Sequence, residues 1–189
     1  MRWGRQESDG ESDESHESGT GKSRHAARRT AVYPPTFVTF VTLVTCITLT
    51  MYDPNNIFAK ILRGEIPAFK VHEDEHTLAF MDVMPQSEGH TLVIPKTAAR
   101  NFFDIDPQAL GRLIQATQHV AKAVRAAFNP DGVRIIQFNE PAAGQTVFHI
   151  HFHIVPCYEG REMKGHARDM ADKTVLAEHA ERIRRALAG

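Results

Sequence analysis

Three histidines that alternate with apolar residues constrain this chain more than any other feature of its sequence. They occupy alternate positions near the end of the segment Val147–Val155. Because successive side chains of a strand point to opposite faces, the alternation predicts a strand over this segment with one apolar face and one histidine face. Neighbours on the same face of a strand lie about 6.6 Å apart along the backbone. We therefore expect His149, His151 and His153 to act together on one target.

Three interpretations of this histidine row compete. A row exposed to solvent is unfavourable, because protonation of one imidazole disfavours protonation of its neighbours. Two of the histidines could share a metal ion with His90 as a remote ligand, but a third strand histidine rarely reaches the same ion. Neutral imidazole is a good nucleophile, and neighbouring histidines can fix its tautomer or move protons near pH 7. We therefore favour nucleophilic catalysis, with no metal and no cofactor.

Overall charge and cysteine content narrow the class of partner. The formal net charge is -1, and the isoelectric point is about 6.8, so no general field attracts nucleic acid or an anionic membrane. We therefore expect a small-molecule partner and no nucleic acid. The two cysteines, Cys46 and Cys157, are too few for a disulfide framework or a Cys-x-x-Cys zinc clamp. They favour a reducing compartment, and we expect the cytoplasm.

The first 50 residues differ from the remainder of the chain. Residues 1–30 are rich in Ser, Gly and charge, which predicts disorder. The uncharged run Thr36–Thr50 is short for a membrane span and has no Ala-x-Ala site after it to support a signal peptide. We favour a mis-assigned start, with Met51 opening the natural product. A targeting or anchoring segment and a functional extension are the alternatives, and no membrane contact is expected for residues 53–189.

From Asp53 onward, the pattern of apolar and polar residues is that of a compact domain. Asp106 and Pro107 predict a helix start, and the turn residues 129–132 predict its end. Period-2 and period-3.6 patterns predict the following elements in order: strands 69–72, 77–83 and 91–94, helix 106–128, strands 133–139 and 147–155, and helix 172–187. This order predicts an α+β fold with a five-stranded antiparallel sheet, one long helix and a C-terminal helix.

The histidine row also resembles a known family signature. Residues His149–Val155 fit the pattern His-φ-His-φ-His-φ-φ, where φ is apolar, which resembles the signature of the histidine-triad (HIT) superfamily of nucleotide hydrolases and transferases. Four further blocks resemble the Hint-like branch of that superfamily: Asn56–Pro67, Ala79–Gln86, Gly89–Lys96 and Gly144–His149. The resemblance implies a HIT-like fold, with a HIT domain over residues 53–160. As in bacterial members, residues 161–189 would form a helical tail that packs on this domain.

The resemblance implies a role for each histidine. His151 would be the nucleophile that forms a nucleotidyl-histidine intermediate. His149 would orient it, and His153 would contact the phosphate or the leaving group. His90 would be the additional histidine that the family places beside the row.

The resemblance also implies a nucleotide site. Gln145 and Thr146 would contact phosphate, Asn139 would face phosphate and ribose, and Gly144 would permit a close backbone approach. Asp82 would accept hydrogen bonds from ribose hydroxyls. An apolar slot for the base would be formed by six residues: Ile57, Phe58, Ile61, Phe80, Val83 and Leu92.

The implied activity is hydrolysis of nucleoside phosphoramidates or adenylyl conjugates with release of a nucleoside monophosphate. The implied assembly is a homodimer built on helix 106–128 and strand 133–139. Three alternatives remain: a dinucleoside polyphosphate hydrolase, a nucleotide-binding regulatory module with incidental turnover, and a zinc-binding histidine array.

Overall fold

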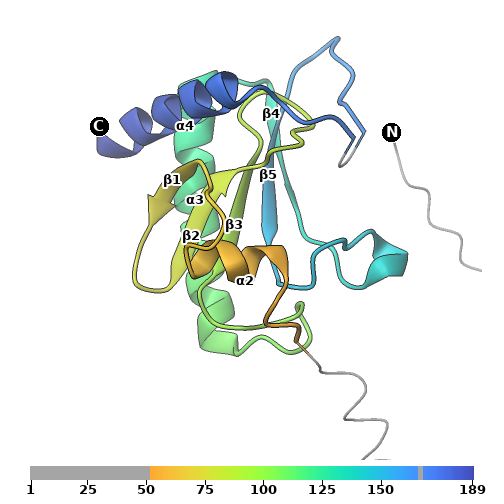
Figure 1. The fold of residues 1–189 in the computed structure, drawn as a ribbon. Coiled ribbons are helices and arrows are strands. Elements are labelled where there is room, and N and C mark those ends of the chain that lie inside the picture. Colours follow the sequence, from red (N-terminus) through yellow and green to blue (C-terminus); the bar gives the residue numbers. More distant parts are fainter. Residues whose placement is uncertain (1–51, 166–167) are drawn as a thin grey trace, which may run out of the picture.

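A single antiparallel sheet forms the centre of the molecule (Figure 1). The computed structural model describes residues 52–165 and 168–189, so the predictions for residues 1–50 lie outside the described residues. The strand order is β1-β2-β3-β5-β4. The strands are β1 (Lys70–Glu73), β2 (Thr77–Met81), β3 (Thr91–Pro95), β4 (Gly132–Ile136) and β5 (Phe152–Cys157). This confirms the predicted α+β fold with five antiparallel strands.

Two helices cover one face of the sheet. In α3 (Pro107–Phe128), the Asp106 side chain accepts hydrogen bonds from two backbone N–H groups, and Asn129 ends the helix in the left-handed conformation. Its apolar stripe packs on the sheet and on α4 (Lys173–Ala188) in one core. Both helices therefore form where the sequence predicts them.

A short helix covers the opposite face, and no pattern had predicted it. Helix α2 (Ile57–Leu62) starts at Asn56, whose side chain accepts hydrogen bonds from two backbone N–H groups. Phe58 and Ile61 of α2 pack in a second core with residues of β2 and β3. Because both faces are covered, β2 and β3 are buried along their whole length. Between β4 and β5, the single-turn 3-10 helix η1 (Pro141–Ala143) completes the described elements.

The structure corrects the predicted strand over Val147–Val155, because β5 begins only at Phe152. Ile150 N–H donates to the carbonyl of Ala99, outside any sheet ladder, and β3 pairs only with residues 152–154 of this segment. His149 and His151 therefore lie on an irregular lead-in to the strand. The apolar alternation persists in the packing, since Ile150 and Phe152 both enter the core under α3.

Two other strands end earlier than predicted. Strand β2 stops at Met81 rather than at residue 83, and β4 stops at Ile136 rather than at residue 139. Residues 82–83 and 137–139 thus form loops at the edge of the site. Within residues 52–165 and 168–189, no helix has the length and apolar character needed to cross a membrane.

Candidate active site

A cavity of about 330 Å³ opens between α2, the ends of β2 and β3, and the histidine row. All six residues predicted for the base slot line it: Ile57, Phe58, Ile61, Phe80, Val83 and Leu92. Asp82, Thr146, His151 and His153 line the same cavity. The structure therefore places an apolar slot directly beside two of the three histidines.

Several lining residues were not predicted from the sequence. Ile66, Pro67 and Ala68 follow α2, and Met170 reaches the cavity from the C-terminal segment. Ala171 N–H donates to the carbonyl of Val83, which fixes the place of Met170 beside the cavity. No sequence pattern indicated Met170, because its approach to the cavity depends on how a segment without regular structure folds back.

The ring of His151 is held by a backbone carbonyl. Its Nδ1 lies 2.7 Å from the carbonyl oxygen of His149, and the ring is buried. A carbonyl oxygen can only accept, so Nδ1 carries the proton and Nε2 carries the lone pair. The Phe58 ring meets the imidazole edge-on with 5.0 Å between centroids. In the neutral imidazole, the contact with the carbonyl of His149 therefore defines one tautomer for His151.

The ring of His149 is fixed at both nitrogens. Nε2 donates to the carbonyl oxygen of Pro95 at 2.9 Å, and Nδ1 lies 2.5 Å from the hydroxyl of Tyr52. Burial lowers the pKa of His149 to about 4, with the neighbouring His151 adding to that effect. His149 is therefore neutral at physiological pH.

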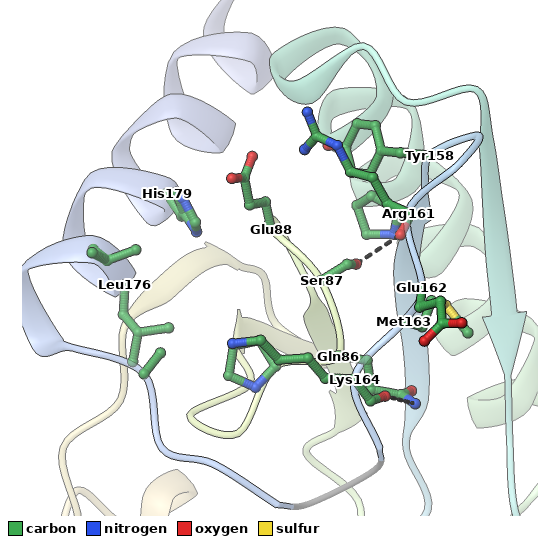
Figure 2. Close-up of a pocket in the computed structure, with 14 residues that line it drawn as sticks. Gln86, Ser87, Glu88, Tyr158, Arg161, Glu162, Met163, Lys164, Leu176 and His179 are labelled. Carbon is green, nitrogen blue, oxygen red and sulfur yellow. Dashed lines mark hydrogen bonds between the residues drawn. The ribbon is translucent and has the colours of Figure 1, made fainter.

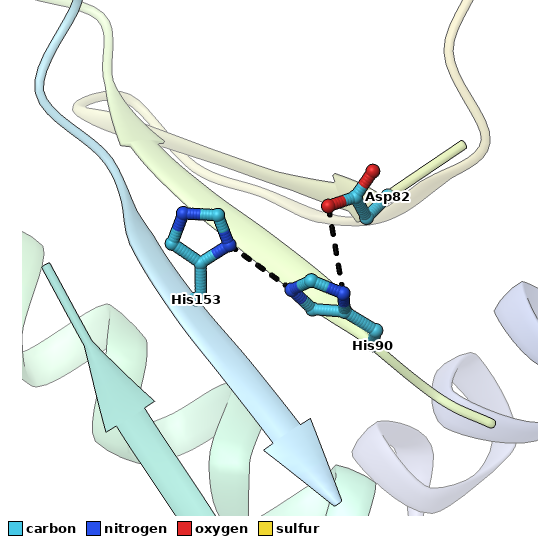
Figure 3. Close-up of side chains that lie close together, drawn as sticks. All are labelled: Asp82, His90 and His153. Atoms are coloured by element: carbon cyan, nitrogen blue, oxygen red, sulfur yellow. Dashed lines mark hydrogen bonds and ion pairs between the residues drawn. The ribbon is translucent and has the colours of Figure 1, made fainter. Parts of the chain in front are cut away.

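The ring of His153 contacts a second imidazole. Its Nδ1 lies 3.0 Å from Nε2 of His90, and both rings are buried (Figure 3). The backbone N–H of Gln86 donates to Nδ1 of His90 at 3.1 Å. Neutral His90 therefore carries its proton on Nε2 and donates to His153, which in turn carries its own proton on Nε2. The ring centroids of His151 and His153 are 4.9 Å apart, so the imidazole of His153 lies beside that of His151.

The same region contains the one group, within the part of the chain that the structure describes, whose geometry could hold a metal ion. Asp82, His90 and His153 offer ligand atoms that all lie within 4.8 Å of one another. Asp82 Oδ2 is 3.4 Å from His90 Nδ1. Because the His90–His153 hydrogen bond already uses two of the nitrogens, an ion bound through them would displace that contact.

The loop that carries Gln86 is held in place from outside the cavity. Behind it lies a second hollow of about 290 Å³, bounded by this loop, the segment after β5 and α4 (Figure 2). Ser87 Oγ donates to the carbonyl of Pro156, and Gln86 exchanges two hydrogen bonds with the backbone of Lys164. These contacts fix the backbone N–H that sets the tautomer of His90.

Three predicted phosphate contacts lie outside the cavity lining. Gln145 is buried, and its amide donates to the carbonyls of Arg100 and Val147 while accepting from Glu140 N–H. Asn139 accepts from Phe102 N–H. The roles of Gln145 and Asn139 at the phosphate therefore stay predictions.

Gly144, the third of these residues, has a φ of +99° and follows η1. This conformation favours glycine, which is a sufficient reason for the residue, and its approach to phosphate also stays a prediction.

A charged network that was not predicted anchors this loop. Arg100 contacts Glu140 through two nitrogens at 2.9 and 2.7 Å, and its guanidinium lies 3.9 Å above the Phe148 ring. The Arg100 hydrogen bond holds the pKa of Glu140 below its usual value. Asn101 also donates to Glu140 at 2.6 Å. The loop before the histidines is thus tied to the segment after β3.

Comparisons with known proteins agree with this geometry. A family model described as the HIT domain matches residues 63–160. The chain is similar to a Hit-like protein involved in cell-cycle regulation from Bartonella henselae, crystallised with an unknown ligand. That match has 51% identity and a TM-score of 0.68, and covers 72% of this chain and 99% of that one.

Two further matches are similar in extent. A zinc-bound histidine triad family protein from Mycobacterium smegmatis is 36% identical, with a TM-score of 0.64 over 71% of this chain and 94% of that one. Protein hit from Bacillus subtilis is 43% identical over 61% of this chain and 83% of its own length.

Proposed function

The chain belongs to the HIT-domain family of nucleotide-binding proteins, and on that premise we propose that it is a nucleotide hydrolase or transferase acting on nucleoside phosphoramidates or adenylyl conjugates. The product would be a nucleoside monophosphate. The observation that carries the proposal is the 2.7 Å hydrogen bond from His151 Nδ1 to the carbonyl of His149. It sets the tautomer in which Nε2 carries the lone pair, the form of imidazole that acts as a nucleophile.

In the first step, His151 Nε2 attacks the α-phosphorus. A P–N bond to His151 forms as the bond from phosphorus to the leaving group breaks, and the leaving nitrogen or oxygen takes the electron pair. The leaving group accepts a proton from Nε2 of His153 while the His90–His153 pair, joined at 3.0 Å, holds one proton beyond its neutral state, so that the transfer leaves two neutral imidazoles. Thr146, at the same cavity, is a donor for the charge that develops on the phosphoryl oxygens.

In the second step, water attacks the same phosphorus. The P–N bond to His151 breaks, the imidazole recovers its lone pair, and one water proton passes to the His90–His153 pair, which regains the proton that it gave up in the first step. The nucleoside monophosphate then leaves, and His151 and the His90–His153 pair are restored to their starting protonation states. Transfer to an acceptor other than water follows the same course.

The cavity supports recognition of the nucleoside. Branched apolar and aromatic side chains form a slot suited to a planar base. Asp82 sits at its polar edge, with Oδ1 accepting from Met84 N–H at 2.9 Å. That bond orients the carboxylate, whose second oxygen can accept from a ribose hydroxyl.

Turnover of an adenosine phosphoramidate tests the proposal. The His151→Ala variant should lose at least about a thousandfold in kcat, because removal of a nucleophile abolishes the covalent route. His119→Ala on the exposed face of α3 is the matched control and should retain the rate. Equal rates for the His151 variant and the wild type would refute the nucleophile, and parallel assays on a diadenosine polyphosphate would show which leaving group is preferred.

The exposed edge of the sheet supports a homodimer. Strand β4 is an edge strand, and Ile135 on it is 47% exposed. Ile114 on α3 is 45% exposed. Unpaired edges and exposed apolar side chains favour association. We expect sedimentation to give twice the monomer mass, and an Ile135→Lys variant to shift the protein toward monomer.

A further inference from the structure

Tyr52 contacts the histidine row from the far end of the described chain. Its hydroxyl lies 2.5 Å from Nδ1 of His149, across 97 positions of sequence. The two rings also meet edge-on, with 5.5 Å between centroids. Burial raises the pKa of the Tyr52 phenol, so it remains a protonated donor.

The direction of this hydrogen bond follows from the other nitrogen of the ring. His149 Nε2 faces the carbonyl oxygen of Pro95 at 2.9 Å, and a carbonyl can only accept, so Nε2 holds the proton. Nδ1 of the neutral ring is therefore an acceptor, and Tyr52 donates to it. The side chain of His149 is thus tied at both ends, to Pro95 and to Tyr52.

This anchoring matters because the backbone here lacks a sheet ladder. His149 precedes β5, and Ile150 N–H to Ala99 is the nearest backbone hydrogen bond. The carbonyl that orients His151 belongs to His149 itself, at 2.7 Å from Nδ1. A shift of the His149 ring would therefore move the group that sets the tautomer of the nucleophile.

We infer that Tyr52 is a positioning residue: its phenol holds His149 in the Nε2–H tautomer and, through the His149 carbonyl, aligns the His151 ring for attack. The inference rests on the proposed function for its kinetic consequence but not for its structural one. Charged and titratable groups that act on His149 are His151 and Asp104, and neither supplies a donor to Nδ1.

The first test is nitrogen NMR of the substrate-free wild-type chain with labelled histidine. The inference requires that Nε2 of His149 be protonated and Nδ1 be an unprotonated, hydrogen-bonded acceptor. A proton on Nδ1 of His149 would overturn it. This result does not depend on turnover, so it stands or falls separately from the proposed reaction.

The second test is Tyr52→Phe, which keeps the ring contact and removes the hydroxyl. We expect kcat to fall about tenfold to a hundredfold with KM nearly unchanged, because alignment is lost while the nucleoside slot is untouched. The Nδ1 resonance of His149 should lose its hydrogen-bond shift, and the His151 tautomer ratio should change. Unchanged kcat together with unchanged His151 signals would overturn the inference.

Tyr158→Phe is the matched control. Its hydroxyl contacts the carbonyl of Phe128 at 3.5 Å, away from the histidine row. It should leave kcat and the histidine signals as in the wild type. Thermal unfolding of both variants separates misalignment from loss of fold, and if Tyr52→Phe does not fold, the wild-type tautomer measurement still decides. An inactive wild type with the expected tautomer would refute the proposed function alone.

Discussion

The two flanks of His151 differ in what their histidines contact. His149 faces a phenol, which keeps its proton near neutral pH, and a carbonyl, which has no proton to exchange. Burial lowers the pKa of His149 itself to about 4. His153 faces a second imidazole, His90, and imidazoles exchange protons near pH 7. Residues of one type, spaced equally along one motif, thus have different properties because their partners differ.

The difference assigns separate tasks to the two flanks. The His149 flank is suited to holding the backbone in place, since its ring is neutral and tied at both nitrogens. The His153 flank is suited to moving a proton, since its ring is joined to a second imidazole, that of His90. The following predictions test that division.

Among the tests of the two flanks, the largest effect is expected at His153. His153→Gln should lower kcat for an adenosine phosphoramidate by about 10²–10⁴, the usual value of general acid catalysis. The loss should nearly vanish for a nucleotidyl p-nitrophenyl ester, because p-nitrophenolate leaves without a proton. Steady-state rates on the two substrates provide the measurement.

For comparison, kcat of the His149→Gln variant is measured on the same two substrates. Misalignment slows both leaving groups alike, so its loss should be equal on the two substrates. If the p-nitrophenyl ester restores the rate of the His149 variant as well as that of the His153 variant, the two flanks do not divide into one that positions and one that transfers a proton.

An effect of intermediate size is expected on the pH dependence of the free energy of unfolding. The folded-state pKa of His149, about 4, lies below its ordinary 6.5. The unfolded chain therefore binds the extra proton, and the contribution of His149 to stability is complete above pH 6.5 and is lost as pH falls toward 4. The full loss is on the order of 3 kcal/mol in the free energy of unfolding.

Urea denaturation at pH 7 and pH 4.5 measures this difference. Wild type should lose more stability over that interval than His149→Gln, which lacks the titrating group. Equal losses for the two proteins would show that His149 is not the buried neutral anchor that its contacts indicate.

A smaller effect is expected at Asp82. Asp82→Asn should raise KM about tenfold through a weakened hydrogen bond to ribose and leave kcat nearly unchanged. With a 2′,3′-dideoxy substrate, the variant and the wild type should have the same KM. A fall in kcat on both substrates would instead make Asp82 part of the proton path, through its 3.4 Å approach to His90.

Local signals in the sequence predicted much of this fold. The helix predicted over 106–128 is α3, because Asp106 and Asn129 are caps whose chemistry acts within one turn. The base slot was predicted on the resemblance of its residue blocks to a family, and all six of its residues line one cavity.

What could not be predicted depends on contacts between distant segments. Alternation predicted a strand through His149, yet Ile150 pairs with Ala99, which only the fold brings close. Tyr52 lies 97 positions from its partner, and no pattern in a single sequence connects them. The resemblance implies a phosphate contact for Gln145, which stays a prediction, while its hydrogen bond to the carbonyl of Arg100, 45 positions away, could not be predicted.

The nucleophile can be identified by detecting the covalent nucleotidyl-histidine intermediate. Wild-type protein mixed with an adenosine phosphoramidate would be quenched within one turnover into alkaline denaturant, which preserves a phosphorus–nitrogen bond, and its peptides analysed by mass. We expect one adenylyl group on His151 and none on His149 or His153. Product formation with no adduct, or with the adduct on another residue, would contradict this expectation.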